Sequence, residues 1–151
     1  MVILLVLAHA GAAAVWLGGM LYSLFVVQPK AARFFGTDDD AYEAFLTTVA
    51  SGNRWKVLAL AGVLALTGAG LLVSQPPATG GQLALHVGEA LLLLLALAVF
   101  AHVSWRLWPR RLFALPHERA AVRARFQRSA YVLVVLVGAA CVLGVVAAQA
   151  R

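Results

Sequence analysis

The sequence predicts an all-α membrane protein, a single domain over residues 1–151 that folds as a four-transmembrane-helix bundle. Hydrophobic residues make up 63% of the 151 residues and the mean hydropathy is +0.90, whereas a soluble domain is about half apolar. The charged residues gather in short segments that separate long uncharged stretches. One crossing of a bilayer needs about 20 apolar residues, so four crossings account for nearly the whole chain.

The first predicted span covers residues 2–28, which contain no Asp, Glu, Lys or Arg. Residues 8–10 read Ala-His-Ala, which resembles a signal-peptidase site. No cation precedes the apolar run, however, and the run continues far beyond the tripeptide. We therefore expect this helix to be retained as the first span.

The next predicted element is a short helix between the first two spans. Thr37, followed by the acidic residues 38–40, has the pattern of an N-cap and a first turn that the helix dipole favours. Apolar residues then recur at helical spacing on one face, namely Tyr42, Phe45, Leu46 and Val49. We expect an amphipathic helix lying on the inner membrane surface. A metal site is the alternative interpretation of the three aspartates, but acidic helix starts are common and favour the capping interpretation.

Three further spans complete the bundle. They are predicted at about residues 55–74, 82–107 and 129–149. A turn rich in Pro and Gly at residues 75–81 joins the second span to the third. Glu89 is the only charged residue inside the third span, and Cys141 is the only cysteine, so no intrachain disulfide can form.

The cations predict the orientation. All lysines and arginines except Arg151 flank the loop after the first span or the loop after the third. The positive-inside rule places these loops in the cytoplasm and both termini outside, as in a bacterial-type inner (plasma) membrane. The excess of 12 Lys and Arg over 6 Asp and Glu thus sets topology. So few polar residues cannot also build a nucleic-acid surface, so the expected partners are the lipid bilayer and either other membrane proteins or a second copy of the chain.

Ionisable side chains at membrane depth are candidates for function because burying them in hydrocarbon is costly. Counting back from the inner ends of their helices places His9, His86 and Glu89 within about 5 Å of one depth, in the outer half of the bundle. His86 and Glu89 share a helix face, and Trp16 follows His9 on one stripe. His102 lies near the inner end.

These residues predict a site for a metal or a cofactor. Two imidazoles on different helices can bind haem iron, and a His pair with a carboxylate can hold a transition metal. We therefore predict His9, His86 and Glu89 as metal ligands, and His9, His86, His102 and Trp16 as residues that bind a cofactor. Two alternatives remain: Glu89 orients a histidine or carries protons, or each imidazole is satisfied by a backbone carbonyl or headgroup.

Two features bear on which ligand is bound. A haem held by His102 would have Arg54 and Arg106 near its propionates, whereas the outer half offers almost no cation. Copper(I) favours sulfur ligands, and the only sulfurs belong to Met1, Met20 and Cys141. The sequence contains no HExxH and no phosphate-binding glycine loop, and no catalytic residue is assigned.

Short motifs along most of the chain resemble a known family. Residues 9–22, HAGAAAVWLGGMLY, are similar to the opening helix of copper resistance CopD proteins and of the related HemJ-type protoporphyrinogen oxidases. Residues 54–72, RWKVLALAGVLALTGAGLL, resemble the CopD pattern of a basic start with Thr-Gly near the outer end. The segment LHVGEALLLL, with His102 downstream, is similar to the third helix of HemJ. Two features depart from HemJ: the Lys expected in the third helix is absent, and Ser23, Leu24 and Phe25 replace the Pro-Arg after Tyr22.

The resemblance implies a four-helix core in the inner membrane and a role in copper or haem handling. HemJ-type proteins carry b-type haem, and on that analogy His9 is the ligand most directly transferred. We therefore expect a CopD-like protein that binds haem b or a copper ion within the bundle. The alternatives are a noncatalytic membrane subunit or scaffold packing against partner helices, and a HemJ-like protoporphyrinogen oxidase.

Overall fold

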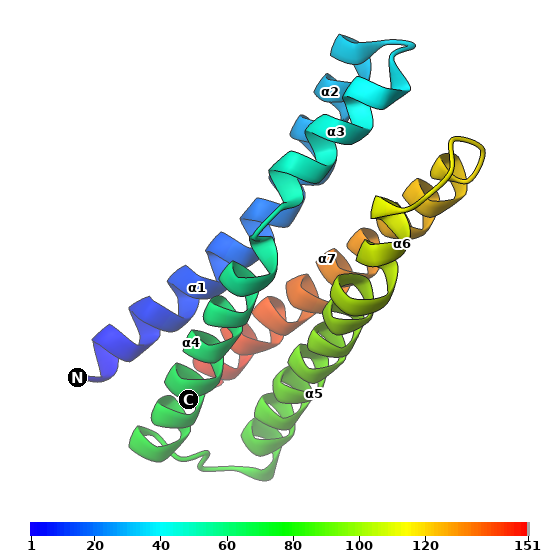
Figure 1. The fold of residues 1–151 in the computed structure, drawn as a ribbon. Helices are drawn as coiled ribbons and strands as arrows, with labels where there is room; N and C mark the ends of the chain where they lie inside the picture. The colour runs from blue at the N-terminus through cyan, green and yellow to red at the C-terminus, as the bar shows by residue number, and fades with distance from the viewer. Residues whose placement is uncertain (151) are drawn as a thin grey trace.

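The computed structural model describes residues 1–150, and every element in this part of the chain is helical (Figure 1). The elements follow one another in the order α1 (Val2–Tyr22), η1 (Ser23–Val27), α2 (Gln28–Phe35), α3 (Asp39–Ala50), α4 (Asn53–Ser74), α5 (Gly80–His102), η2 (Val103–Leu107), α6 (Trp108–Leu112) and α7 (Arg119–Gln149). The labels η1 and η2 denote single π-helical turns.

The helices form two antiparallel hairpins. In the first, α1, η1 and α2 run as one rod and α3 with α4 returns beside it; in the second, α5, η2 and α6 run out and α7 returns (Figure 1). α1 packs against α4, α5 packs against α7, and α1 also contacts α7. Four helical segments are long and apolar enough to cross a membrane, namely Val2–Phe35, Asp39–Ser74, Gly80–Leu112 and Arg119–Gln149. The prediction of a four-helix membrane protein is confirmed at this level.

The chain ends lie at one end of the bundle, together with the connection between α4 and α5 (Figure 1). The side chain of Gln82, at the start of α5, donates a hydrogen bond to the backbone oxygen of Ala150 at 2.7 Å and accepts one from the backbone N–H of Ala78, also at 2.7 Å. Gln82 is buried, so these bonds satisfy a buried amide. The two remaining connections lie at the opposite end, which we call the basic end because it holds most of the arginines.

Two predicted spans continue past their expected ends. α1 was expected to end at residue 28 and the third span at 107, yet the rods extend to Phe35 and Leu112, through Pro29 and Pro109. Proline removes a helical hydrogen bond and clashes with the carbonyl four residues earlier. Each proline stands directly after a π-helical turn, at the start of α2 or α6. The wider turn accommodates the proline, so the helix continues.

The last helix begins earlier than predicted, at Arg119 instead of about residue 129. Its arginine-rich first turns lack the apolar character that marks a span, which is why hydropathy alone missed them. Ion pairs from Arg119 and Arg123 to Asp39 support these turns. Hydropathy therefore predicts the membrane-spanning part of this helix but not its charged first turns.

The predicted amphipathic helix is present as α3, but its expected cap and placement are wrong. Asp38, not Thr37, is the N-cap, and its carboxylate accepts a hydrogen bond from the backbone N–H of Ala41 at 3.0 Å. α3 does not lie across the bundle: it packs along α2 and runs nearly in line with α4 (Figure 1). Only a short break at residues 51–52 separates α3 from α4, and Gly52 takes a left-handed φ of +74° there.

The two hairpins repeat one plan. His9 and Glu89 are 80 residues apart and contact each other, and Pro29 and Pro109 have the same separation, as do the two π-helical turns. The two hairpins therefore share the spacing of their π-helical turns and prolines, and His9 and Glu89 are a pair at this spacing that meets across the interface. Trp16, 3% exposed, and its counterpart Ala96, 0% exposed, both lie in the central apolar cluster.

Candidate functional site

A polar cluster lies where α1, α4 and α5 come together, and its central residue is His9. The Nδ1 atom of His9 lies 2.8 Å from the hydroxyl oxygen of Thr67 on α4. That hydroxyl lies 2.6 Å from the Val63 backbone oxygen, to which it donates its hydrogen. The Thr67 oxygen is then free to accept, so Nδ1 of His9 carries a proton and its lone pair remains on Nε2.

The Nε2 atom of His9 faces a carboxylate. It lies 3.4 Å from Oε1 of Glu89, which comes from α5, and each of the two side chains is 23% exposed. An imidazole nitrogen and a carboxylate oxygen from different helices therefore meet at the outer end of the hydrogen-bond range.

His86 completes the cluster from the same helix face as Glu89. Its Nδ1 atom lies 3.9 Å from Oε2 of Glu89, one helical turn away, and its side chain is 18% exposed. Glu89 is thus approached by one imidazole at each oxygen. The structure brings together the three side chains that the sequence places at one depth, although α1 and α5 make little backbone contact.

Two glycines make room for this cluster. A methyl group on Gly68 would meet Cε1 of His9 at 3.4 Å, and one on Gly144 of α7 would meet Oε1 of Glu89 at 3.0 Å. The second distance is tighter than nine in ten contacts of real Cβ atoms, so a side chain at position 144 would require the carboxylate to shift by a few tenths of an ångström. The sequence analysis did not assign Gly144 or Thr67 to the site, and only the Thr-Gly pair at 67–68 was a signal for it.

The other two predicted cofactor residues lie apart from the cluster. Trp16 is two turns further along α1, 3% exposed, and packs in the apolar core with Leu64 and Ala96. His102 is the last residue of α5 and its side chain is exposed. The guanidinium of Arg54 donates to the Ser104 backbone oxygen at 2.6 Å and lies over the Trp105 ring, 4.9 Å from its centroid. Arg54 therefore reaches the helix end that carries His102 and Arg106, which is where the sequence analysis expected it.

The donor atoms of the cluster suit a metal ion in chemistry and only in part in geometry. Two ligands at about 2.1 Å from an ion lie about 3.4 Å apart in a tetrahedral site and about 3.0 Å apart at right angles in the tetragonal site of copper(II). His9 Nε2 and Glu89 Oε1 are 3.4 Å apart, so copper(II) would draw them slightly closer. His86 is a third donor at a longer distance, 3.9 Å from the carboxylate. Among residues 1–150, no group of three or more His, Cys, Asp or Glu side chains is arranged to hold an ion. Binding with three protein ligands requires a rotation of the His86 side chain.

The surroundings of His9 do not fit a haem. Nδ1 is bonded to Thr67 and Nε2 faces Glu89, so neither nitrogen is directed into open space. A cavity of about 600 Å³ lies further along the bundle, beyond Trp16, and no histidine lines it in the part of the chain that the structure describes. A haem ligated by His9 would require these side chains to move.

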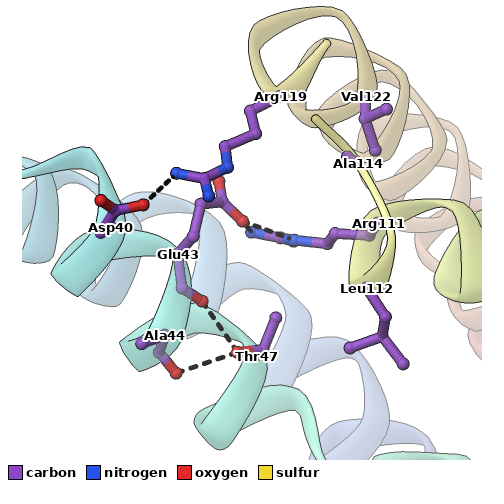
Figure 2. A pocket seen from close by; sticks show the side chains of 9 residues that line it. All are labelled: Asp40, Glu43, Ala44, Thr47, Arg111, Leu112, Ala114, Arg119 and Val122. Carbon is purple, nitrogen blue, oxygen red and sulfur yellow. Dashed lines mark hydrogen bonds and ion pairs between the residues drawn. The ribbon is translucent and has the colours of Figure 1, made fainter. Parts of the chain in front are cut away.

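A second polar cluster lies at the basic end and joins α3 to α6 and α7 (Figure 2). We call it the clasp, and it consists of Asp39, Asp40, Glu43, Arg111, Arg119 and Arg123. Arg111 donates two hydrogen bonds to one oxygen of Glu43, at 2.9 and 3.0 Å, and the other oxygen lies 3.3 Å from Arg123. Arg119 pairs with Asp40, as Figure 2 shows. A cavity of about 210 Å³ lies among these side chains.

The clasp shifts the titration of its members. The hydrogen bond from Arg123 lowers the pKa of Asp39 below its usual value, aided by the charge of Arg119. The hydrogen bond to Asp40 raises the pKa of Arg119. The sequence analysis interpreted the acidic run only as a helix start. The sequence does contain an indication that this acidic run pairs with arginines. Most acidic residues lie in one short segment, and most arginines lie in or beside the other loop at the same end of the bundle.

Comparisons with known proteins do not assign the chain to a family. No family model matches the sequence, and neither a characterised protein nor a solved structure matches it. The four long apolar helices identify a multi-pass membrane protein.

Proposed function

We propose that this multi-pass membrane protein binds one transition-metal ion at His9, Glu89 and His86, and that the preferred ion is copper(II). The observation that carries the proposal is the hydrogen bond between His9 Nδ1 and Thr67 at 2.8 Å. Histidines that bind metals usually donate their other ring N–H to an oxygen, which fixes the tautomer and the ring orientation. Here that bond leaves the Nε2 lone pair facing a carboxylate.

The donor set favours copper(II) over copper(I). Imidazole and carboxylate suit divalent ions of the first transition row, among which copper(II) binds most tightly, whereas copper(I) prefers thiolate and thioether. The resemblance of residues 9–22 to CopD proteins also favours copper. In a membrane, a metal ion at this cluster would neutralise the carboxylate that is otherwise costly to bury.

The proposal includes an orientation. The cations flanking residues 36–38 and 113–118 would place the basic end in the cytoplasm, and both termini and the turn at 75–79 outside. The cluster would then lie in the outer half of a bacterial-type inner membrane, where it is reached from outside. Its role would be to take up or hold copper on that side.

Copper content of the purified protein tests the proposal. The protein in mild detergent is loaded with copper(II), desalted and measured by elemental analysis. Wild type should retain stoichiometric copper, His9→Ala and Glu89→Gln should lose most of it, and His86→Ala should bind more weakly. His102→Ala is the control, because this exposed histidine lies outside the cluster, and it should bind as wild type does.

Three results would overturn the proposal. Copper retained equally by wild type and His9→Ala would show that the ion binds elsewhere. A Soret band in the purified protein that disappears in His9→Ala would show that haem b is the ligand and that the cluster opens to admit it. Protein that holds neither ligand but copurifies with a membrane partner would support the scaffold alternative.

A further inference from the structure

A cavity of about 600 Å³ lies between the two hairpins, in the half of the bundle toward the basic end. It lies between the central apolar core and the clasp, since Arg111 and Arg123 of the clasp are among its lining residues. Trp16 and Leu133, which belong to the central apolar core, line the cavity. The cavity is therefore separate from the cluster of His9, Glu89 and His86, and its volume is in the range of ligand sites, about 300–1,000 Å³.

Both π-helical turns contribute to the wall of this cavity. Ser23, Leu24 and Val27 belong to η1, and Val103 and Ser104 to η2, and all of them line the cavity. Single π-helical turns inside α-helices occur frequently at functional sites, where the extra residue changes the helix surface. Their occurrence at equivalent positions of the two hairpins, facing one space, is an observation independent of the cavity itself.

The charges along the wall have one sign. The cations that line the cavity are Arg54, Lys56, Arg111 and Arg123, and no acidic residue contributes to the lining formed by residues 1–150. Arg111 and Arg123 are also held by the carboxylates of the clasp. Lys56 is exposed and makes no ion pair with any described residue, and Arg54 donates to a neutral backbone oxygen. These last two cations retain capacity for an anion.

We propose that the cavity binds an anionic phospholipid from the leaflet at the basic end. One acyl chain would fill the apolar part of the cavity, and the phosphate would lie against Arg54 and Lys56. An apolar wall with cations at one end only is complementary to an amphipathic anion. Basic pockets between transmembrane helices on the cytoplasmic side are known to bind anionic lipid headgroups. The proposal depends on the membrane environment of the chain and not on the metal site.

Native mass spectrometry of the protein in detergent tests this proposal. The protein is mixed with phosphatidylglycerol or with phosphatidylcholine carrying the same acyl chains, and bound lipid is counted as collision energy rises. Wild type should retain one phosphatidylglycerol under conditions that remove phosphatidylcholine. Lys56→Gln should lower the preference for phosphatidylglycerol about fivefold. Lys30→Gln removes an exposed cation that does not line the cavity, and it should leave the preference unchanged.

A matched pair of glycine variants tests the location. Gly19 lines the cavity and its neighbour Gly18 does not, and an added Cβ has open space at both positions. Gly19→Phe should fill the cavity and abolish lipid retention, whereas Gly18→Phe should retain the lipid. Equal thermal unfolding of the two variants checks that both are folded. If Gly19→Phe does not fold, Gly19→Leu and Gly18→Leu replace them.

Three results would overturn the proposal. Equal retention of the two lipids would indicate lipid that only surrounds the helices. Equal loss in the Gly18 and Gly19 variants would place the lipid outside the cavity. Displacement of phosphatidylglycerol by inorganic phosphate alone would show that the cations bind a free anion without an acyl chain.

Discussion

At the scale of single residues, the chemistry of the polar cluster depends on which nitrogen of His9 carries a proton. Thr67 has one hydroxyl hydrogen, which goes to the Val63 carbonyl, so its oxygen can only accept from His9. This short chain of bonds is contained within two helices. The sequence alone shows Thr67 only as part of a Thr-Gly pair in the second span. In the structure, Thr67 is the residue that orients the imidazole.

Replacing this threonine tests its orienting role. Thr67→Val keeps the shape of the side chain but leaves His9 Nδ1 without its acceptor. Loss of such an outer partner typically weakens metal binding about 10- to 100-fold, and we expect that decrease in competition with a chelator. Thr48→Val is the control, because that hydroxyl bonds only to its own helix at Ala44. Equal copper affinity in the two variants would contradict the orienting role.

Depth could be predicted from the sequence at this scale, but partners could not. A fixed rise per residue places His9 and Glu89 at one level once the helix ends are known. Nothing in the one-dimensional pattern says which helix faces which, so the bond from His9 to Thr67 on α4 was not foreseen. His102 shows the converse, because an ionisable residue near a helix end needs no buried partner: its side chain is exposed.

At the scale of elements, close approach between α5 and α7 shapes the site. Glu89 packs against Gly144, where an added Cβ would lie only 3.0 Å from the carboxylate and would push it aside. Small residues commonly allow membrane helices to approach each other. The sequence indicated such packing in general, but it did not single out the glycine that the carboxylate needs.

Substitution of this glycine should disturb the carboxylate. A methyl group from Gly144→Ala would lie 3.0 Å from Glu89 Oε1, so we expect about tenfold weaker copper binding and a loss of about 1–3 kcal/mol from overpacking. Gly138→Ala, on the same helix, meets nothing within 4 Å. This control should keep its affinity and gain up to about 1 kcal/mol from lower backbone entropy. Chelator competition and thermal unfolding measure the two effects, and indistinguishable variants would contradict the account.

The clasp should respond to acid. The pKa of Asp39 is lowered from 3.8 in the folded protein by its bond to Arg123. The pair therefore contributes its stability above about pH 3.8 and loses it as the pH falls through the lowered value. We expect the distribution of distances between spin labels on α3 and α7 to be narrow near pH 7 and to broaden once the pH falls below the lowered pKa of Asp39.

Two variants show whether Asp39 is responsible for that change. Asp39→Asn should broaden the distance already at neutral pH, because the ion pair with Arg123 is gone. Asp38→Asn is the control, since this carboxylate caps α3 and accepts from a backbone N–H, and it should keep the acid response. A distance distribution that stays narrow in the wild type throughout an acid titration of the folded protein would show that other contacts hold the hairpins together.

At the scale of the whole molecule, the bundle is built from two hairpins with the same spacing of π-helical turns and prolines. His9 and Glu89 occupy equivalent positions in the two hairpins, and so do the buried residues Trp16 and Ala96. The contact between the hairpins brings a histidine of one half against a carboxylate of the other. The number and type of the helices could be predicted, because hydropathy and charge report on lipid contact. The packing of one hairpin on the other is set by a few side chains and could not.

Orientation is the remaining prediction at this scale. With Cys141 replaced by Ala, a single cysteine at Gln75 should react from outside intact cells with a reagent that does not cross membranes. A single cysteine at Phe113, beside the arginines of the basic end, should react only after the cells are opened. The opposite pattern would invert the topology and place the metal site in the inner half of the membrane.

The most direct test of the central claim is anomalous X-ray diffraction at the copper absorption edge from crystals of the copper-loaded protein. We predict one strong peak about 2.0–2.1 Å from Nε2 of His9 and next to the Glu89 carboxylate, with Thr67 still bonded to Nδ1. A peak elsewhere in the bundle, or no peak while His9 and Glu89 remain in contact, would contradict the claim that these residues form a metal site.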